Sequence, residues 1–161
     1  MKRVLSLILA VVLAFSCLLA FSSCSTEVTY EEFHEKAVEA HEKLYNKTNK
    51  KIDEDTTELV PIKGQMKITS RGETKKGKFT ATVYKETVVL KSAGDDIEWY
   101  ANLYVGSTAA VQLPDELFHD YTYKAGPFGF EITDGTTVKR YNSKGLLTHY
   151  ESDLTTVDIN W

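Results

Sequence analysis

The histidines are the first residues to examine for chemistry. His34-Glu35 begins like the helix of a zinc peptidase, in which two histidines four residues apart hold the metal. The second ligand would fall at position 38, which is Val38, and His41 comes seven residues after His34, two helical turns away. This spacing is poor for chelating one ion. We therefore expect His34 and His41 to be half-exposed residues that flank the apolar stripe of a helix.

The motifs of nucleophilic catalysis and phosphate binding are absent from the sequence. There is no G-x-S-x-G motif, and Gly126-Pro127-Phe128-Gly129 lacks the spacing and the following helix that a phosphate-binding loop needs. His119 and His149 are isolated in the sequence, so a hydrolytic site would have to assemble around one of them in space. We predict that the protein is not an enzyme and has no catalytic residues and no cofactor.

Two short acidic runs raise the question of a cation site. Asp53-Glu54-Asp55 and Asp95-Asp96 do not fit the twelve-residue calcium loop, which needs glycine at its sixth and glutamate at its twelfth position. Asp95-Asp96 follows Gly94, and aspartate is common in turns because its carboxylate binds nearby backbone N–H groups. We predict a turn there and no metal site.

Four basic residues cluster around Gly72 and Gly77. They are Arg71, Lys75, Lys76 and Lys78. We interpret this cluster as a solvated hairpin tip, whose charges also discourage edge-to-edge pairing of strands. The alternative interpretation is that the tip contacts anionic headgroups of a membrane.

Tyrosines form the pattern that best suits a binding site. In an extended strand, Tyr100 and Tyr104 lie on the face opposite Trp99, and Tyr84 shows the same two-sidedness beside Val83. Rings with a polar tip suit a half-wet groove for an amphipathic ligand. They also suit ordinary cross-strand pairs on a solvated sheet, so both interpretations stay open. Tyr84, Tyr100 and Tyr104 are the candidate ligand-binding residues.

The N-terminus has the pattern of an export signal. Lys2 and Arg3 precede an apolar run over 4–21, and small residues lead to Cys24. The tetrad Phe21-Ser22-Ser23-Cys24 resembles the bacterial lipobox, whose cysteine receives a diacylglyceryl group. This resemblance to bacterial lipoproteins implies a signal peptide over 1–23 and lipidation at Cys24. It also implies a protein anchored in the cell membrane and facing the extracytoplasmic side.

Two alternatives to lipidation keep the folded part outside the cytoplasm. The 18 residues of 4–21 are long enough to span a bilayer as an uncleaved helix, with Lys2 and Arg3 on the inner side. An ordinary signal peptide, cleaved near Ala20 to Ser23, would instead release a soluble product.

Charge and cysteine content limit the remaining possibilities. Removing 1–23 takes away two bases and no acid, so the net charge falls from −4 to −6, which disfavours a nucleic-acid partner. Both cysteines, Cys17 and Cys24, lie at or before the anchor. The folded part therefore has no disulfide, and its stability must come from packing.

The rest of the chain predicts a single α+β domain over 29–161, joined to Cys24 by a polar tether over 24–28. Thr29 and Glu32 fit a capping box, and apolar residues recur at helical spacing up to Leu44, which predicts one amphipathic helix. Beyond about Glu58, alternating runs predict about eight antiparallel strands, of which 97–105 is the most regular. Asp134-Gly135 predicts a type I′ hairpin turn and 142–145 a further turn. A helical turn is expected over 114–120.

In outline, this order of elements is similar to the periplasmic lipoprotein-carrier (LolA/LolB-like) superfamily. The resemblance covers 29–161 and rests on strand–turn–strand segments such as Tyr141-Asn142-Ser143-Lys144-Gly145-Leu146-Leu147. It implies a helix packed on a curved antiparallel sheet that surrounds an apolar cavity. We expect a non-catalytic binding module for a lipid, peptide or amphipathic small molecule. The alternative is a structural or protein-interaction lipoprotein of the envelope without a small ligand.

Overall fold

A large antiparallel sheet dominates the fold. In the computed structural model, residues 25–52, 57–111 and 121–161 are described. Nine of their strands form one sheet in the order β1-β7-β8-β9-β10-β11-β4-β5-β6, and β2 pairs with β3 separately. The elements are β1 (Thr26–Val28), α2 (Tyr30–Thr48), β2 (Asn49–Lys51), β3 (Thr57–Leu59), β4 (Ile62–Ser70), β5 (Glu73–Val83), β6 (Val88–Ala93), α3 (Glu98–Val105), β7 (Thr122–Gly126), β8 (Gly129–Thr133), β9 (Val138–Asn142), β10 (Leu147–Ser152) and β11 (Thr155–Asn160).

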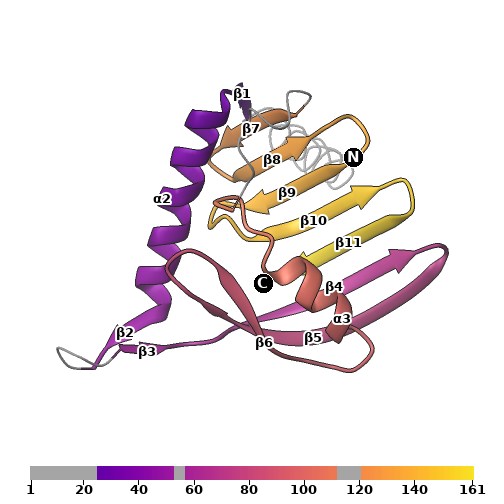
Figure 1. Ribbon diagram of the computed structural model, residues 1–161, viewed down its shortest axis with the longest axis horizontal. Helices are drawn as coiled ribbons and strands as arrows, with labels where there is room; N and C mark the ends of the chain where they lie inside the picture. The colour runs from indigo at the N-terminus through magenta and orange to yellow at the C-terminus, as the bar shows by residue number, and fades with distance from the viewer. Residues whose placement is uncertain (1–24, 53–56, 112–120) are drawn as a thin grey trace, which may run out of the picture.

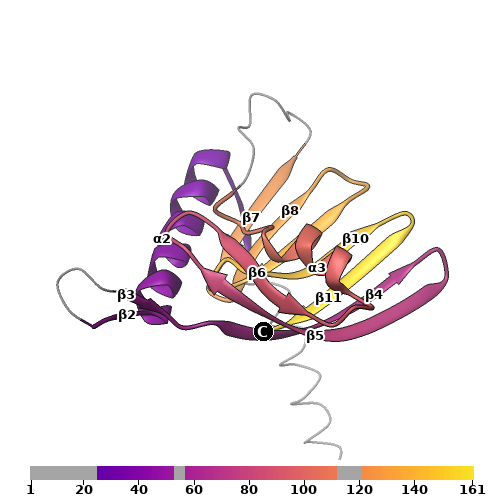
Figure 2. The ribbon, with the colours of Figure 1, turned by 60° about the horizontal axis from the view of Figure 1, so that its bottom comes forward.

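The sheet consists of two meanders joined side by side. β4 to β6 form one and β7 to β11 the other, and β11 joins them by pairing with β4 over six residues (Figure 1). The sheet is strongly curved, with α3 lying over its hollow side (Figure 2). We call this side the inner face and the opposite side the outer face. The predicted α+β class with a large antiparallel sheet is confirmed. The described residues contain two helices rather than one, and eleven strands rather than about eight.

Helix α2 begins at its predicted cap and buries one stripe. The hydroxyl oxygen of Thr29 accepts a hydrogen bond from the backbone N–H of Glu32 at 3.3 Å. The ring of Phe33 packs against Tyr123 and Phe130 of the sheet, with centroids 5.2 and 5.6 Å apart. His41 is buried in this stripe at 2 % exposure, so the prediction that it is half-exposed is wrong. Its Nε2 lies 2.8 Å from the carbonyl oxygen of Tyr84. This hydrogen bond replaces the one that an exposed imidazole would make with water.

The segment predicted as the most regular strand is helix α3. The apolar residues over 97–105 occur at every second position, as in a strand. Three of them, Ile97, Ala101 and Val105, are also four residues apart and therefore share one side of a helix. All three are at most 1 % exposed. Ile97 packs onto Gly77 of β5, where an added Cβ would come within 2.6 Å of the isoleucine side chain. Tertiary packing on the sheet therefore selects the helical periodicity.

The predicted hairpins form, with one difference in turn type. Gly135 has a φ of +88°, but Thr136 does not share a positive φ. A type I′ turn needs a positive φ at both central residues, so the turn is of the type II′ kind. The carboxylate of Asp134 accepts hydrogen bonds from the backbone N–H groups of Thr136 and Thr137. In the turn over 142–145, Asn142 plays the same role for Lys144 and Leu146.

At the N-terminal side, part of the predicted tether belongs to the sheet. Thr26–Val28 form β1, which pairs with β7 in the register Thr26 to Ala125. The predictions for the signal peptide over 1–23, Cys24, Asp53-Glu54-Asp55, the helical turn over 114–120 and His119 lie outside the described residues. Within the part of the chain that is described, neither helix is long and apolar enough to cross a membrane.

Candidate functional site

Helix α3 and two hairpin ends enclose a hollow of about 480 Å³ on the molecule, which we call the α3 hollow. Ligand sites for small molecules commonly have volumes of this order. The hairpin ends are the β4–β5 turn at Arg71 and the β10–β11 turn at Leu154. They are tied together by a hydrogen bond from the Arg71 N–H to the Leu154 carbonyl oxygen at 3.1 Å. A second link joins the hydroxyls of Ser70 and Thr155 at 3.0 Å.

Aromatic and aliphatic side chains form about half of the lining of the α3 hollow, and polar or charged side chains form the rest. Tyr100 and Tyr104 are one helical turn apart on α3, and both line the hollow as half-buried residues. The Tyr104 ring packs against Tyr150 of β10 at a centroid distance of 5.1 Å. Burial raises the pKa of Tyr104 above its ordinary value, with smaller contributions from Tyr150 and Tyr100. Its hydroxyl is therefore a neutral hydrogen-bonding group at any physiological pH.

Large apolar side chains are also exposed at the rim of the α3 hollow. Trp99 is 69 % exposed, Leu103 55 % and Leu154 62 %. Single exposed apolar residues are common on protein surfaces, but a group of them around one hollow indicates a place where something binds.

Charged groups at the α3 hollow are mainly basic. Arg71 and Lys75 line it together with one acid, Glu73. The Nζ atom of Lys75 lies 5.8 Å from the centre of the Tyr100 ring, within the range of a cation–π contact. A ligand with an apolar body and a negative group would match both kinds of lining.

A half-buried lysine lies on the inner face of the sheet. Lys139 of β9 lies directly opposite Tyr150 of β10, whose ring contacts Tyr104. Burial lowers the pKa of Lys139, and Asp134 opposes this effect. A partly desolvated ammonium group therefore lies beside Tyr150, whose ring packs against Tyr104 of the α3 hollow.

The structure brings together only two of the three predicted ligand-binding tyrosines. Tyr100 and Tyr104 line the α3 hollow, whereas Tyr84 is 45 % exposed in the β5–β6 turn and does not line it. The predicted shared strand face of Tyr100 and Tyr104 is wrong, because they lie on a helix. Trp99, Leu103 and Leu154 were missed as candidates. The four-residue spacing of Trp99 and Leu103 was the only signal for them in the sequence.

The predicted basic cluster does not form one tip. Lys75 points toward α3 on the inner face, whereas Lys76 and Lys78 alternate onto the outer face of β5. Arg71 alone lies in the turn, where it has a φ of +50°.

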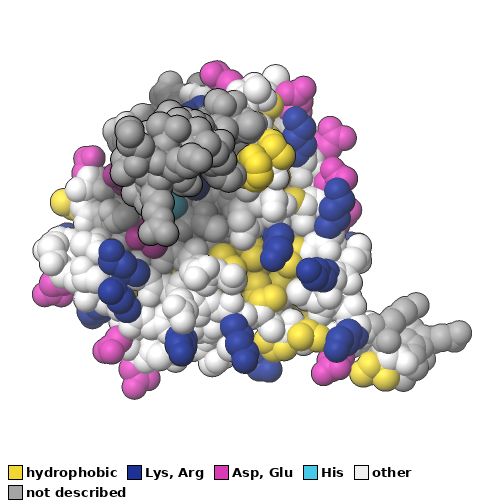
Figure 3. Space-filling model, turned by 180° about the vertical axis from the view of Figure 1, so that it is seen from behind, with side chains coloured by type: hydrophobic (Ala, Val, Ile, Leu, Met, Phe, Trp, Pro, Cys, Tyr) yellow, Lys and Arg dark blue, Asp and Glu magenta, His cyan; other side chains and the backbone are white. Residues whose placement is uncertain are grey.

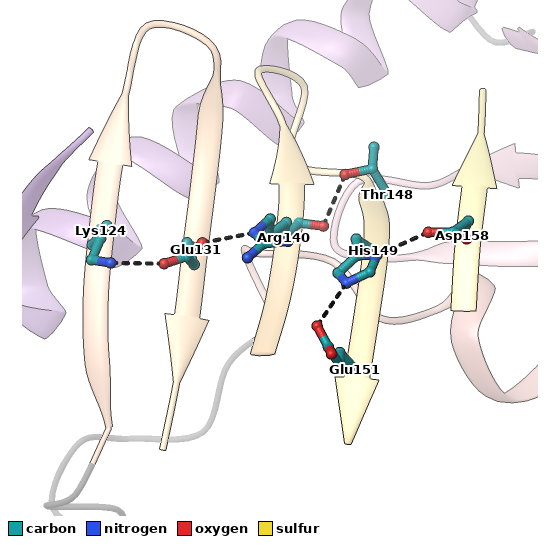
Figure 4. A network of polar contacts seen from close by, with 7 residues as sticks. All are labelled: Lys124, Glu131, Arg140, Thr148, His149, Glu151 and Asp158. Carbon is teal, nitrogen blue, oxygen red and sulfur yellow. Dashed lines mark hydrogen bonds and ion pairs between the residues drawn. The ribbon is translucent and has the colours of Figure 1, made fainter. Parts of the chain in front are cut away.

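The remaining candidate residue, His149, belongs to a charge network on the outer face. Its Nδ1 lies 2.9 Å from Asp158 and its Nε2 3.4 Å from Glu151, so both ring nitrogens face carboxylates (Figure 4). A catalytic triad needs one nitrogen directed at a nucleophile, which this arrangement does not provide. The two carboxylates lie at opposite ring nitrogens and do not converge, and no metal-binding group of three such residues occurs in the described part of the chain.

The same network continues through Glu131 toward the N-terminal edge. Glu131 accepts hydrogen bonds from Lys124 and Arg140, each at 2.8 Å (Figure 4). Burial acts to raise the pKa of Glu131, but the hydrogen bonds from the two bases outweigh it and hold this pKa below its ordinary value. The charge of Glu131 is balanced by its own neighbours in the sheet, so we interpret this cluster as structural ion pairing and not as a ligand-binding site.

Comparison of the chain with models of protein families, with curated proteins and with solved structures gave no match. The α3 hollow must therefore be interpreted from its own chemistry.

Proposed function

We propose that the protein is a lipid-anchored, extracytoplasmic binding module without catalytic activity, and that its ligand occupies the α3 hollow. The ligand class is an amphipathic anion, such as a fatty acid or a lipid with an acidic group. The observation that carries this proposal is the placement of Tyr100 and Tyr104 beside Lys75 in a hollow of about 480 Å³.

The lining accounts for both parts of such a ligand. The apolar body would contact the tyrosine rings and Leu103, where burial of apolar surface contributes about 25 cal/mol per Å². The acidic group would be held by Lys75 and Arg71 at the mouth of the hollow. The surface position of these bases keeps them hydrated until the ligand arrives, so the empty site costs little stability.

The anchor part of the proposal rests on the tetrad before Cys24. Two ester-linked chains at one cysteine suffice for stable attachment, since a single chain binds a membrane only marginally. Intact-mass measurement of the membrane-extracted protein tests it. The expected mass is that of a chain starting at Cys24 with an added diacylglyceryl group. A chain starting at Met1, or a free Cys24 thiol, would exclude the anchor.

The binding part is tested with the protein extracted from its own membranes and oleate as the probe. Calorimetric titration should show binding of oleate and none of dodecyltrimethylammonium, which has the opposite charge. We expect Tyr100→Ala to weaken oleate binding by about tenfold, because loss of about 55 Å² of apolar contact between the ring and the acyl chain costs on the order of 1.4 kcal/mol.

The matched control is Tyr84→Ala, which removes an equally large ring outside the α3 hollow. It should bind oleate as tightly as the unaltered protein. Equal loss in both variants, or no binding of oleate at all, would contradict the assignment of the ligand to this hollow.

A second function is favoured by the exposed rim of Trp99, Leu103 and Leu154. Such a rim fits a protein partner in the envelope, in which case no small ligand would be present. Native mass spectrometry of the protein from its own host separates the two functions. Co-purified lipid supports the binding module, whereas an empty protein that crosslinks to an envelope protein through position 99 supports the second function.

A further inference from the structure

Lysines gather on the outer face of β4 and β5, away from the α3 hollow. Lys67 and Lys76 are directly opposite each other in the strand pair, and Lys63 and Lys78 extend the group along the same two strands. All four side chains are exposed. We call this group the lysine face. Figure 3 views the molecule from this side and shows lysines and arginines spread over it.

The lysine face lacks internal compensation. Like charges directly opposite each other in a sheet are destabilising. The nearest acid in register is Asp158, which lies opposite Lys67 on the other side but binds His149. Among the described residues, none of the four lysines forms an ion pair. The uncompensated charge stands out in a chain with a net charge of −4, and it points to an external anion as the partner.

The start of the described chain lies on the same outer face. Ser25, which follows Cys24, lines a hollow of about 510 Å³ together with Lys124 and Arg140 of the outer face and with Phe128 of the β7–β8 turn. Phe128 is 58 % exposed. Because β1 begins at Thr26, only Ser25 separates Cys24 from the sheet, and the chain from Cys24 to Thr26 reaches about 7 Å.

We propose that the outer face lies flat against an anionic bilayer. Phe128 enters the interface beside the anchor, and the lysine face binds the negatively charged headgroups at the other end of the sheet. This inference rests on the lipid anchor of the proposed function. The short connection to Cys24 favours a membrane over a soluble polyanion, because it holds the face next to headgroups at a high effective concentration.

The test uses the membrane-extracted, lipidated protein in two kinds of vesicle. One kind contains phosphatidylcholine alone and the other an equimolar mixture with phosphatidylglycerol. Acetylation of individual lysines is followed by mass spectrometry. In the anionic vesicles, Lys63 and Lys78 should react about fivefold more slowly, which corresponds to about 1 kcal/mol per lysine near the surface. Salt at 1 M shortens the screening length to about 3 Å and should abolish this protection.

Two lysines of helix α2 provide the internal control. Lys36 and Lys47 are exposed on α2 and should react equally in both kinds of vesicle. The variant Lys67→Ala/Lys76→Ala should reduce the protection of Lys63 and Lys78, whereas Lys36→Ala/Lys47→Ala should leave it unchanged. The first variant removes a repulsive pair, so its folding is not expected to suffer.

Three outcomes would overturn the proposal in distinguishable ways. Equal acetylation of the lysine face in both vesicles would exclude membrane contact while leaving the anchor intact. Protection by added polyphosphate but not by phosphatidylglycerol would indicate a soluble polyanion. Failure to sediment with either vesicle would remove the anchor, and the proposed orientation with it.

Discussion

The Nε2 atom of His41 lies 2.8 Å from the carbonyl oxygen of Tyr84, so helix α2 is hydrogen-bonded to the end of strand β5. Since a carbonyl can only accept, Nε2 carries the proton and donates it. The Nδ1 atom of His41 is buried without a partner among the described residues. The contact joins α2 to the turn between β5 and β6, two segments whose bonded residues are 43 positions apart in the sequence.

Replacement of His41 should destabilise the protein far more than replacement of His34. His41→Ala removes a buried ring and leaves the Tyr84 carbonyl oxygen without its donor, which should cost about 2–3 kcal/mol. His34 is half-exposed and stacks on Tyr30 at 5.7 Å, so His34→Ala should cost less than about 1 kcal/mol. Urea denaturation of both variants measures the difference. Equal losses would contradict a structural role for the His41 contact.

The burial of His41 illustrates what local sequence patterns do not predict. The helix, its cap at Thr29 and its stripe through Phe33, Ala37 and Leu44 follow from local spacing, and all were predicted. The partner of His41 is a backbone carbonyl in a distant turn, which no local pattern encodes. Pairing of β11 with β4 is likewise set by the closure of the whole sheet.

Helix α3 shows a different kind of limit. Its apolar residues satisfy a period of two and a spacing of four at the same time. Only the packing of Ile97 against Gly77 and the burial of Ala101 decide between a strand and a helix. Because the tyrosines were assigned to a strand, the candidate site was predicted in part: Tyr100 and Tyr104 line one hollow, but its exposed rim was not foreseen.

Substitution of Gly77 should disturb α3 and with it the α3 hollow. In Gly77→Ala, the new Cβ would meet the Ile97 side chain at 2.6 Å, so either this side chain or the start of α3 must shift. We expect a loss of about 1–3 kcal/mol, typical of overpacking, and weaker oleate binding. The matched control is Gly94→Ala, where nothing lies within 4 Å of the added Cβ. If both variants melt at the same temperature and bind oleate equally, Ile97 does not position the site.

The Glu131 network predicts a pH-dependent contribution to stability. The pKa of Glu131 is lowered in the folded state, so the unfolded state binds more protons as the pH falls below the ordinary value of 4.5. The contribution of Glu131 to the free energy of unfolding is therefore complete above about pH 4.5. It is lost as the pH falls through the lower pKa that Glu131 has in the folded state.

Glu131→Gln tests this sign. At pH 7 the variant should be less stable by about 1 kcal/mol, since its partners are partly exposed. The difference from the unaltered protein should vanish in strongly acidic solution. Glu39→Gln, on the exposed surface of α2, should change little at either pH. A constant difference across this range would show that the carboxylate charge is not responsible.

Whereas ionised Glu131 stabilises the folded protein, the charged ammonium group of Lys139 destabilises it, because this group is partly buried. The folded-state pKa of Lys139 is lowered, so at pH 7 the charged group costs stability. Between this lowered pKa and the ordinary value of 10.5, the unfolded state binds more protons and stability rises with pH. Lys139→Met keeps most of the length of the side chain and should be more stable than the unaltered protein at pH 7. Its advantage should shrink as the pH approaches 10.5, which urea denaturation at several pH values can follow. If the Lys139→Met advantage is independent of pH, desolvation of the ammonium group is not its cause.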